Sequence, residues 1–494
     1  MTVRLAKEES PDMPKLQTVA ATVMHSLQGL GLLLAITALT ACAGLPTEDP
    51  QRLARSAQSY AAAQSFAGAA GVWPGDRWWT AYGDAQLDGL MQEALAGSPT
   101  LAGAQARVRS AEAAAGRTRA AGMPSLTADA SAERMKQSYN NGFPKAFLPQ
   151  GYNTYDRLAF DFSWELDFWG KNRAAVAAAT SEAFAAQADA AEARLMLSTN
   201  LAAAYADLGR LYAERDVAER ALTVQAESSR LVADRVANGL DTRGAQRQAE
   251  AGPLQAQADL AGVDEQIALA RNRLAALLGA GPDRGLAIAR PAAVALQPLG
   301  MPAALAADLV GRRPDVAAAR WRAQAAAARI HEAKAAFFPD INLTGFVGVQ
   351  ALHLSQTFAR GSDIGALGPA LSLPIFEGGR LKAGLRGAEA DRDIAVASYD
   401  ATVTEAFRQV ADVLASARAL ALERTSSRDA LAASEDAYRI ARLRYQGGLS
   451  AYPTVLLAEQ TVLQRRRALA DLDARGLALD IALVRALGGG FQAS

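Results

Sequence analysis

The chain has 494 residues, half of them hydrophobic, and its 51 basic and 51 acidic residues leave no net charge. A nucleic-acid-binding protein normally carries a basic face, so this balance argues against nucleic acid as a partner. Much of the hydrophobic content is alanine, and alanine-rich sequence mixed with Arg, Glu and Gln favours helices over a thick apolar core.

The N-terminal segment has the pattern of a signal peptide. An apolar run from Leu30 to Leu39 ends in Leu39-Thr40-Ala41-Cys42, which contains the only cysteine of the chain. Such a run is too short to span a bilayer, which needs ~20 residues, but it suits a signal-peptide core. The tetrapeptide resembles a bacterial lipobox, so we expect residues 1–41 to be cleaved and Cys42 to carry diacylglycerol and palmitate. A lone cysteine is more often a buried hydrophobe, but its place directly after the signal core favours lipidation. The first residues hold as many acids as bases, which is unusual for a signal peptide, so Met13 is an alternative start.

The second half of the chain repeats the first. Ser98-Pro99 recurs as Arg313-Pro314, and the Ala-x-x-x-Pro of 120–124 recurs at 335–339, both at one offset (314 − 99 = 339 − 124 = 215). This spacing is far longer than the ~20–50 residues of solenoid or propeller units. We therefore predict one duplicated domain: after a lipidated extension (42–86), a first repeat (87–300), a second repeat (301–490) and a tail (491–494).

Each repeat is predicted to contain a long helical hairpin, at 173–279 and 380–488. The first helix of each pair would be on the order of 95 Å long at ~1.5 Å per residue. Glycines at Asn238-Gly239 and Gly447-Gly448 suit the left-handed conformation that ends a helix. Apolar residues step by three and four in narrow stripes, which indicates helices packed side by side as in a coiled coil; the stripes are Val403, Phe407, Val410, Leu414, Ala417 and Ala421, and Leu469, Leu472, Gly476, Leu479, Leu483 and Ala486.

Each repeat also contains a predicted β-hairpin, at 125–168 and 340–376. From Leu158 to Phe168, large apolar residues alternate with polar ones such as Asp161 and Glu165. This alternation is typical of a transmembrane barrel strand of ~9–11 residues. A half-buried sheet of a soluble α+β domain is the alternative, but the flanking helices are too long and too thinly apolar to cover it. Four strands cannot close a barrel, which needs at least eight in a single chain, so cyclic assembly of copies is expected. Three copies would supply twelve strands.

Several motifs in a fixed order carry a family resemblance over nearly all of Trp78 to Gly488. They are Trp78-Trp79, Tyr82-Gly83-Asp84-Ala85-Gln86-Leu87, Ser98-Pro99, Trp164-Glu165-Leu166-Asp167-Phe168-Trp169-Gly170-Lys171, Arg312-Arg313-Pro314-Asp315-Val316, and Leu371-Ser372-Leu373-Pro374-Ile375-Phe376-Glu377-Gly378-Gly379-Arg380. The chain resembles outer membrane factors of the TolC type, in their NodT-like lipoprotein branch. The resemblance implies an α+β membrane protein: a homotrimeric channel-tunnel with a shared 12-stranded β-barrel and a long α-helical barrel. It also implies a periplasmic membrane-fusion adaptor and an inner-membrane pump as partners; a pump of the RND type is favoured, and an ATP-driven pump is the alternative.

Three sets of residues are candidate sites. By resemblance, the helix turns dock the adaptor through Arg235, Gly239, Leu240, Arg444, Gly448 and Leu449. A periplasmic constriction is expected from Asp241, Arg243, Tyr452, Thr454 and Leu457, with Leu457 closing the pore by apolar contact; alternatively, Tyr452 and Leu457 only pack between helices. Acids on the polar side of the first β-hairpin would form cation-favouring rings in the barrel lumen, unless Arg157 or Arg134 neutralises them; these acids are Asp129, Glu133, Asp161, Glu165 and Asp167.

We therefore predict a passive, lipid-anchored export duct of the bacterial outer membrane, in contact with its lipid and serving drug or antibiotic efflux. An enzyme is not expected, because His331 and His353 form neither a triad nor a metal spacing. No cofactor is expected beyond the lipid on Cys42. The alternatives are a periplasmic coiled-coil scaffold lipoprotein that forms no pore, and a duct for type I protein secretion.

Overall fold

The computed structural model describes residues 52–56, 59–67, 72–140, 142–292 and 311–492. These residues form two compact units. The first unit contains 118–176 and 327–390, and the second contains 52–117, 177–326 and 391–492. Cys42 and the predicted signal peptide lie outside the described residues.

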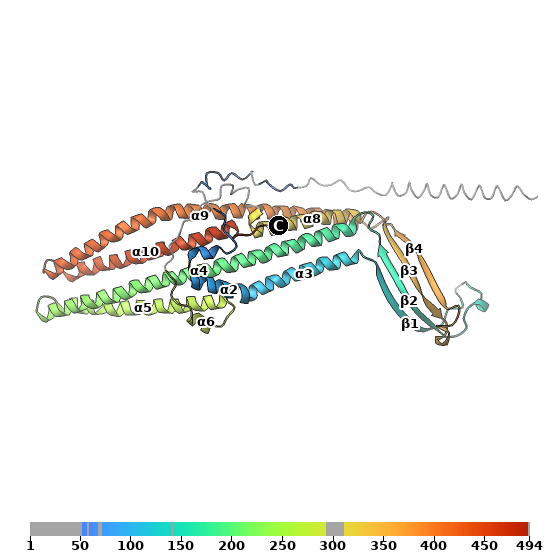
Figure 1. Cartoon of the computed structure of the whole chain (residues 1–494), viewed down its shortest axis with the longest axis horizontal. Helices are drawn as coiled ribbons and strands as arrows, with labels where there is room; N and C mark the ends of the chain where they lie inside the picture. Colours follow the sequence, from blue (N-terminus) through green and yellow to red (C-terminus); the bar gives the residue numbers. More distant parts are fainter. Residues whose placement is uncertain (1–51, 57–58, 68–71, 141, 293–310, 493–494) are drawn as a thin grey trace, which may run out of the picture. The chain divides into compact units, whose positions relative to one another are not determined.

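The first unit is built around a four-stranded antiparallel sheet whose strands follow one another in chain order (Figure 1). The strands are β1 (Ser125–Met135), β2 (Asn153–Glu165), β3 (Asp340–Ala351) and β4 (Asp363–Ser372). β1 and β2 lie within the expected hairpin 125–168, and β3 and β4 within 340–376. β1 and β4 form the two edges of the sheet, and neither edge has a further strand partner within the described residues.

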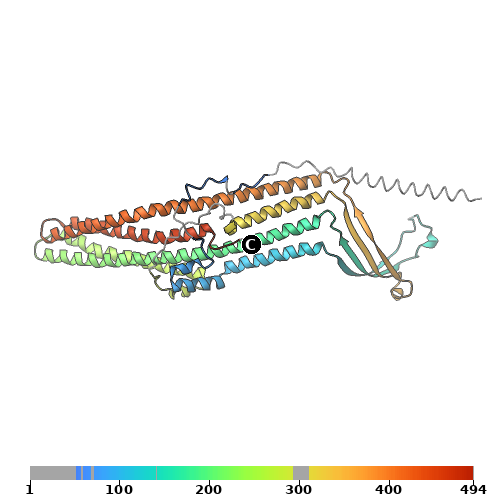
Figure 2. The ribbon, with the colours of Figure 1, turned by 45° about the horizontal axis from the view of Figure 1, so that its top comes forward.

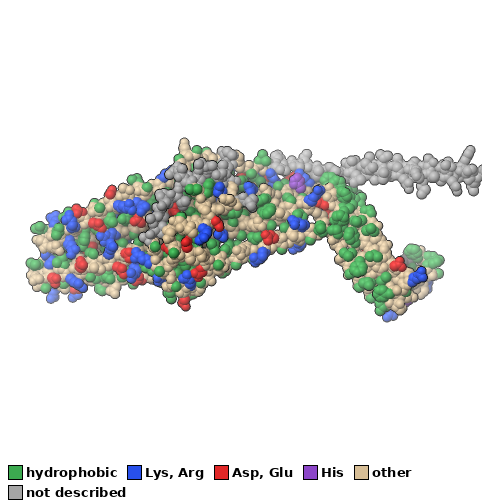
Figure 3. Space-filling model, viewed as in Figure 1, with side chains coloured by type: hydrophobic (Ala, Val, Ile, Leu, Met, Phe, Trp, Pro, Cys, Tyr) green, Lys and Arg blue, Asp and Glu red, His purple; other side chains and the backbone are tan. Residues whose placement is uncertain are grey.

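The register of the sheet separates apolar side chains from polar ones. Leu126 pairs with Phe162, and Phe160 pairs with Val347, so these side chains share one face. The residues between them point to the opposite face, because successive side chains of a strand alternate. That polar face carries Thr127, Asp161, Ser163 and Thr344. In the view of Figure 3, hydrophobic side chains gather over the strands.

The second strand ends earlier than the sequence pattern predicts. β2 stops at Glu165, and Asp167 lies beyond it. The Asp167 carboxylate accepts hydrogen bonds from the backbone N–H groups of Asn172 (3.2 Å) and Arg173 (2.9 Å), in the first turn of α4 (Lys171–Ala237). Free N–H groups at a helix N-terminus attract a carboxylate. Asp167 therefore caps α4 and is not part of the strand. The prediction that Asp167 continues the polar side of the strand is therefore wrong.

Trp169 joins the two repeats within the first unit. Its ring stacks on Phe338, with the ring centroids 4.8 Å apart, and its indole N–H donates to the carbonyl oxygen of Pro339 at 2.8 Å. Phe338 and Pro339 follow α8 (Pro314–Ala335). The motif that ends the first β-hairpin thus packs against the Ala-x-x-x-Pro motif that precedes the second.

The second unit contains two long helical hairpins, seen as paired ribbons in both views (Figures 1 and 2). The first consists of α4 and α5 (Arg243–Leu277), and the second of α9 (Arg380–Gln446) and α10 (Tyr452–Leu487). α4 and α9 have 67 residues each and begin in the first unit. No helix among the described residues is apolar enough over a sufficient length to cross a membrane.

The apolar stripe of α9 is buried only in part. Val403, Phe407, Val410 and Leu414 are buried, as the stripe predicts, but Ala417 and Ala421 are exposed and Leu420 is buried instead. An ideal helix drifts by ~20° per heptad relative to a 3.5-residue repeat. The contact face therefore moves round the helix after Leu414.

Short helices pack on the long ones around the main core of the second unit. They are η2 (Trp78–Tyr82), α2 (Ala85–Gly97), α3 (Pro99–Ala121) and α6 (Asp283–Leu286); η3 (Lys145–Phe147) and η4 (Leu354–Gln356) lie in the first unit. Asp84 caps α2 by accepting from the backbone N–H groups of Gln86 and Leu87. It also accepts the Tyr205 hydroxyl of α4 at 2.7 Å, and burial together with this bond raises the pKa of Tyr205. One carboxylate therefore both caps α2 and fixes it to α4.

Two glycines allow the same close contact in both halves of the chain. Gly279 lies shortly after the end of α5, and Gly488 directly follows α10. Their φ angles of 74° and 91° are in the left-handed region. A Cβ atom at Gly279 would collide with the Gly97 carbonyl oxygen, and one at Gly488 with the Arg312 carbonyl oxygen. The end of α5 thus packs against the start of α3, and the end of α10 packs against the start of α8.

The chain between Arg52 and Ala67 lies along α9, and we call its described residues (52–56 and 59–67) the N-terminal strap. The Arg55 backbone N–H donates to the Asp400 carboxylate at 3.0 Å. The rings of Tyr60 and Phe66 both stack on Phe407, with centroid distances of 5.2 and 5.4 Å. Both polar and aromatic contacts therefore hold the strap on the second half of the chain.

Candidate functional site

The two helix turns, with the adjoining ends of α4, α5, α9 and α10, form what we call the hairpin tip. At this tip the Tyr445 hydroxyl donates to the Asp241 carboxylate at 2.6 Å. The Arg235 guanidinium lies over the Tyr445 ring, 4.6 Å from its centroid, and 3.8 Å from the same carboxylate. Burial, followed by the bond to Asp241, raises the pKa of Tyr445. A hydrogen bond to a charged group contributes about 1.5–3 kcal/mol, so this cluster joins the first hairpin to the second.

The two turns have the same backbone geometry. Gly239 and Gly448 have φ of 72° and 74°, and the N–H of the leucine that follows each one bonds back to a carbonyl of the preceding helix at 2.8 Å. Both leucines, Leu240 and Leu449, are exposed. Arg444 is exposed as well. Arg235 differs from the other predicted docking residues because its side chain contacts Tyr445 and Asp241 within the tip.

Two residues of the predicted constriction, Asp241 and Tyr452, both contact Tyr445. Tyr452 is buried and packs near the Tyr445 ring, which agrees with the alternative that it only fills space between helices. Leu457 is 68 % exposed, and Thr454 and Arg243 are exposed too. Leu457 therefore has no packing role within its own chain, and its role in closing a pore stays a prediction.

Glu459 is a feature of the tip that the sequence analysis missed. Its side chain is 2 % exposed, and neither carboxylate oxygen has a hydrogen-bond partner in the described part of the chain. Burial raises its pKa to about 7, although Ser228 and Arg442 act in the opposite direction. A signal was present in the sequence: Tyr452, Val455, Glu459 and Val462 step by three and four, which places an acid on an otherwise apolar stripe. Tyr445 was also missed, because its partner Asp241 is distant in sequence.

The polar face of the sheet holds the remaining predicted lumen acids. The Arg157 guanidinium donates to Asp161 at 2.8 Å, as the neutralising alternative supposes. Lys171 bridges Glu165 (3.0 Å) and Asp340 (3.2 Å). Asp129 and Glu133 are exposed, and no Lys or Arg of the described residues forms an ion pair with either. Of the predicted lumen acids on this face, Asp161 and Glu165 are therefore ion-paired. Asp129 and Glu133 are not, although the charge of Arg157 also acts on Asp129.

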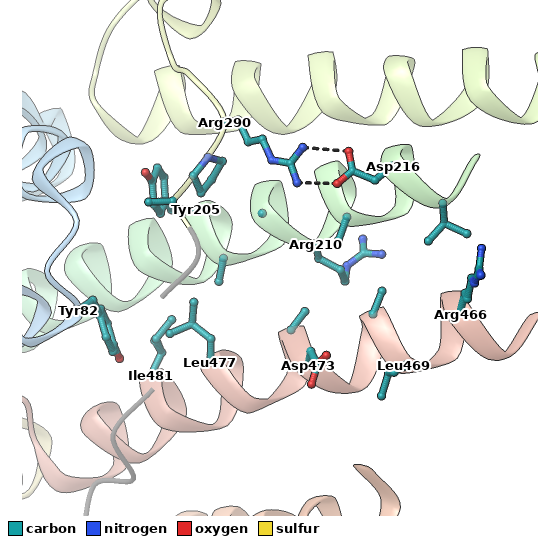
Figure 4. Close-up of a pocket in the computed structure, with 18 of the residues that line it drawn as sticks. Tyr82, Tyr205, Arg210, Asp216, Arg290, Arg466, Leu469, Asp473, Leu477 and Ile481 are labelled. Carbon is teal, nitrogen blue, oxygen red and sulfur yellow. Dashed lines mark hydrogen bonds and ion pairs between the residues drawn. The ribbon is translucent and has the colours of Figure 1, made fainter. Parts of the chain in front are cut away.

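A cavity of about 600 Å³ lies between α4 and α10 in the second unit (Figure 4). Arg290 reaches across its wall and binds Asp216 through two bonds of 2.7 and 2.9 Å, which hold the pKa of Asp216 below its usual value. Two further arginines of the cavity wall form ion pairs, Arg210 with Glu214 and Arg466 with Glu435. These ion pairs tie neighbouring segments of the cavity wall together.

The described part of the chain contains two histidines. His331 lies on α8 and His353 directly precedes η4. Within the part of the chain that the structure describes, no three His, Cys, Asp or Glu side chains are grouped so that they could hold a metal.

Comparison with known proteins gives concordant results. A family model described as outer membrane efflux protein matches residues 90–280 and 305–489. The chain is 38% identical to the fusaric acid resistance protein FusA of Burkholderia cepacia over 71% of this chain and 67% of that one. It is 33% identical to the multidrug resistance outer membrane protein MdtP of Escherichia coli K12, over 85% and 88% of the two chains. The crystal structure of the outer membrane protein VceC from Vibrio cholerae superposes with a TM-score of 0.81 at 45% identity, covering 85% of this chain and all of that one.

Proposed function

The chain belongs to the outer membrane efflux protein family, and we propose that it is the passive outer-membrane duct of a tripartite efflux pump. Its relatives and structural neighbours are outer membrane channel proteins rather than enzymes. In this proposal the chain performs no chemistry, needs no cofactor, and takes its energy from an inner-membrane pump of the RND type through a periplasmic adaptor. The names of its relatives concern drugs and fusaric acid, which favours small organic molecules over the protein cargo of type I secretion.

The observation that carries the proposal is the open-edged sheet with one apolar and one polar face. An unpaired backbone group facing lipid costs several kcal/mol. Three copies joined by β1 and β4 would pair every edge in a barrel of twelve strands, with the apolar face toward lipid and the polar face toward a lumen. A scaffold that forms no pore would not need such a sheet.

The hairpin tip would be the periplasmic end of the duct. Exposed Leu240, Leu449 and Arg444 are the groups available to an adaptor. Arg235, Asp241 and Tyr445 would instead hold the two hairpins of one subunit together. Leu457 would then be the residue through which three subunits close the pore.

Single-channel recording in a planar bilayer tests the duct directly. We expect discrete conductance steps and a preference for cations, because Asp129 and Glu133 would face the lumen and neither forms an ion pair within the described residues. Asp129→Asn with Glu133→Gln should lower the cation preference, measured as the reversal potential in a salt gradient. Asp363→Asn is the matched control, since Asp363 pairs with Val349 on the other face of the sheet. A preparation with no discrete conductance would contradict the duct, and an unchanged reversal potential in the double variant would remove the lumen role of these acids.

Lipidation of Cys42 is a separate part of the proposal and rests on the sequence. A single acyl chain gives only marginal membrane binding, whereas an assembled barrel is a permanent anchor. Cys42→Ser should therefore lose the lipid, as mass spectrometry would show, yet leave a fraction of assembled protein in the outer membrane. Complete release into the soluble periplasm on fractionation would argue against the barrel.

A further inference from the structure

Two loops lie at the end of the sheet that does not lead into the helices. The β1–β2 loop spans 136–152 and the β3–β4 loop spans 352–362. Because β1 and β3 run in the same direction, both loops leave the sheet at the same end. Neither contains an Asp or Glu, although acids and bases are equally common in the whole chain. The loops instead carry the cationic side chains Lys136, Lys145 and Arg360. We call the described residues of both loops the loop surface.

Two of these cations are held close to one aromatic ring. The Lys136 ammonium lies 5.3 Å, and that of Lys145 5.1 Å, from the centroid of the Tyr139 ring. The Tyr139 hydroxyl accepts the backbone N–H of Gly151 at 2.8 Å, and the Gln150 amide donates to the Lys145 carbonyl oxygen at 2.7 Å. The loop's own hydrogen bonds therefore fix the arrangement.

Within the described residues, the two ammonium groups have no anionic partner. Both lysines are exposed, and neither forms an ion pair with any carboxylate of the described residues. Like charges around one ring repel each other, and the face of the ring offsets only part of that repulsion. An anion bound between them would remove the repulsion, and phosphate is an anion that lysine binds well as a point charge.

The loop surface also exposes large apolar side chains. Phe147 is 83 % exposed and Phe358 is 80 % exposed, and Tyr152 and Leu354 are also exposed. Apolar side chains of this size are rarely left together on a surface that faces only water. Aromatic groups beside lysines are instead typical of protein surfaces at the headgroup level of an anionic membrane.

We propose that the loop surface binds phosphate-bearing lipid headgroups of the outer leaflet around the duct. Lys136 and Lys145 bind the phosphates, and Phe147 and Phe358 enter the boundary between headgroups and acyl chains. This rests on the proposed function, which puts the free end of the sheet at the outer face of the membrane. The ligand would hold the two loops in place on the membrane.

Lipid binding to the purified full-length protein in non-ionic detergent tests this proposal. The probes are lipid A, a glycolipid with two phosphates, the same lipid after phosphatase treatment, and inorganic phosphate. A lysine near an anionic surface contributes about 5-fold in affinity, so Lys136→Gln with Lys145→Gln should weaken lipid A binding roughly 25-fold. Lys382→Gln is the matched control, because Lys382 is an exposed lysine of the same unit on α9 and should leave the affinity unchanged.

The dephosphorylated lipid and inorganic phosphate show whether the bound phosphate belongs to a lipid or is a free ion. Dephosphorylated lipid should bind the original protein as weakly as lipid A binds the double variant. Inorganic phosphate that binds as tightly as lipid A would overturn the lipid assignment, and so would equal affinity of the original protein and the double variant. Channel recording on the same preparations keeps the two proposals apart. Normal conductance with equal lipid affinities refutes the loop proposal alone, whereas missing conductance in all preparations refutes the duct.

Discussion

The hairpin tip is expected to lose stability as the pH rises from about 4.5 to about 7, and Glu459→Gln is expected to abolish this loss. Burial raises the pKa of Glu459 from 4.5 to about 7. Between these values the folded tip keeps a proton that the unfolded chain has released, so stability falls with rising pH and levels off above 7. At ~1.36 kcal/mol per pKa unit, the loss is about 3 kcal/mol.

The groups around Glu459 explain why the loss of stability is confined to the hairpin tip. The groups that act on it are Ser228 of α4 and Arg442 of α9, and it acts in turn on Tyr438 and Tyr452. The only opposing charge among them, Arg442, also lies 4.0 Å from Glu227 of α4. An ionised Glu459 thus stays largely uncompensated inside the tip, where a buried charge without a full partner is costly.

Hydrogen exchange of the backbone amides of α9 and α10 at the tip, followed from pH 4.5 to 8, measures the effect. Protection should fall with pH in the original protein and stay flat in Glu459→Gln. Glu435→Gln is the control, since Glu435 is ion-paired with Arg466 at 2.7 Å; it should keep the original pH profile. The same pH dependence in Glu459→Gln would assign the effect to another group.

Replacing Leu457 with serine is expected to open the duct at rest. Three converging leucines would exclude water from the pore and block ions by dewetting. Leu457→Ser should raise basal conductance and dye leakage in cells without the pump, and Leu457→Ala should do so less, because alanine remains apolar. Leu422→Ser is the control, because Leu422 on α9 is equally exposed, at 72 %.

Two results would separate gating from packing at Leu457. In its own chain the side chain is exposed, so the substitution should not destabilise the monomer. Equal loss of trimer in the serine and alanine variants, with conductance unchanged, would assign Leu457 to packing between subunits and would refute the gate.

The elements could be read from the sequence because they depend on local patterns. The alternation of apolar and polar residues predicts the position of β2, and Gly239 and Gly448 predict the positions of the helix turns. Asp167 was misplaced because its partners, the first N–H groups of α4, compete with the strand for the same residue. A period-two pattern does not reveal where a helix will begin.

The contacts that build the site depend on residues far apart in the chain. Tyr445 and Asp241 meet through the packing of two hairpins, and no spacing rule links them. Glu459 could have been noticed on its stripe, but its lack of a partner is a property of the packed tip. The pairing of Asp161 with Arg157 was foreseen only as an alternative, because two residues on one face of a strand can either pair or face water.

The N-terminal strap implies an order of events during biogenesis. Its hydrogen bonds to α9 join residues 340 to 353 positions apart, such as Arg52 with Arg392 and Ser65 with Arg418. A chain that leaves the ribosome N-terminus first releases the strap long before α9 exists, and contacts of such long range form late and slowly. Cys42 is only ten residues before Arg52 (52 − 42 = 10). If Cys42 is acylated as proposed, the acylating enzymes would therefore meet an undocked N-terminus, and docking of the strap would follow modification as one of the last steps of maturation.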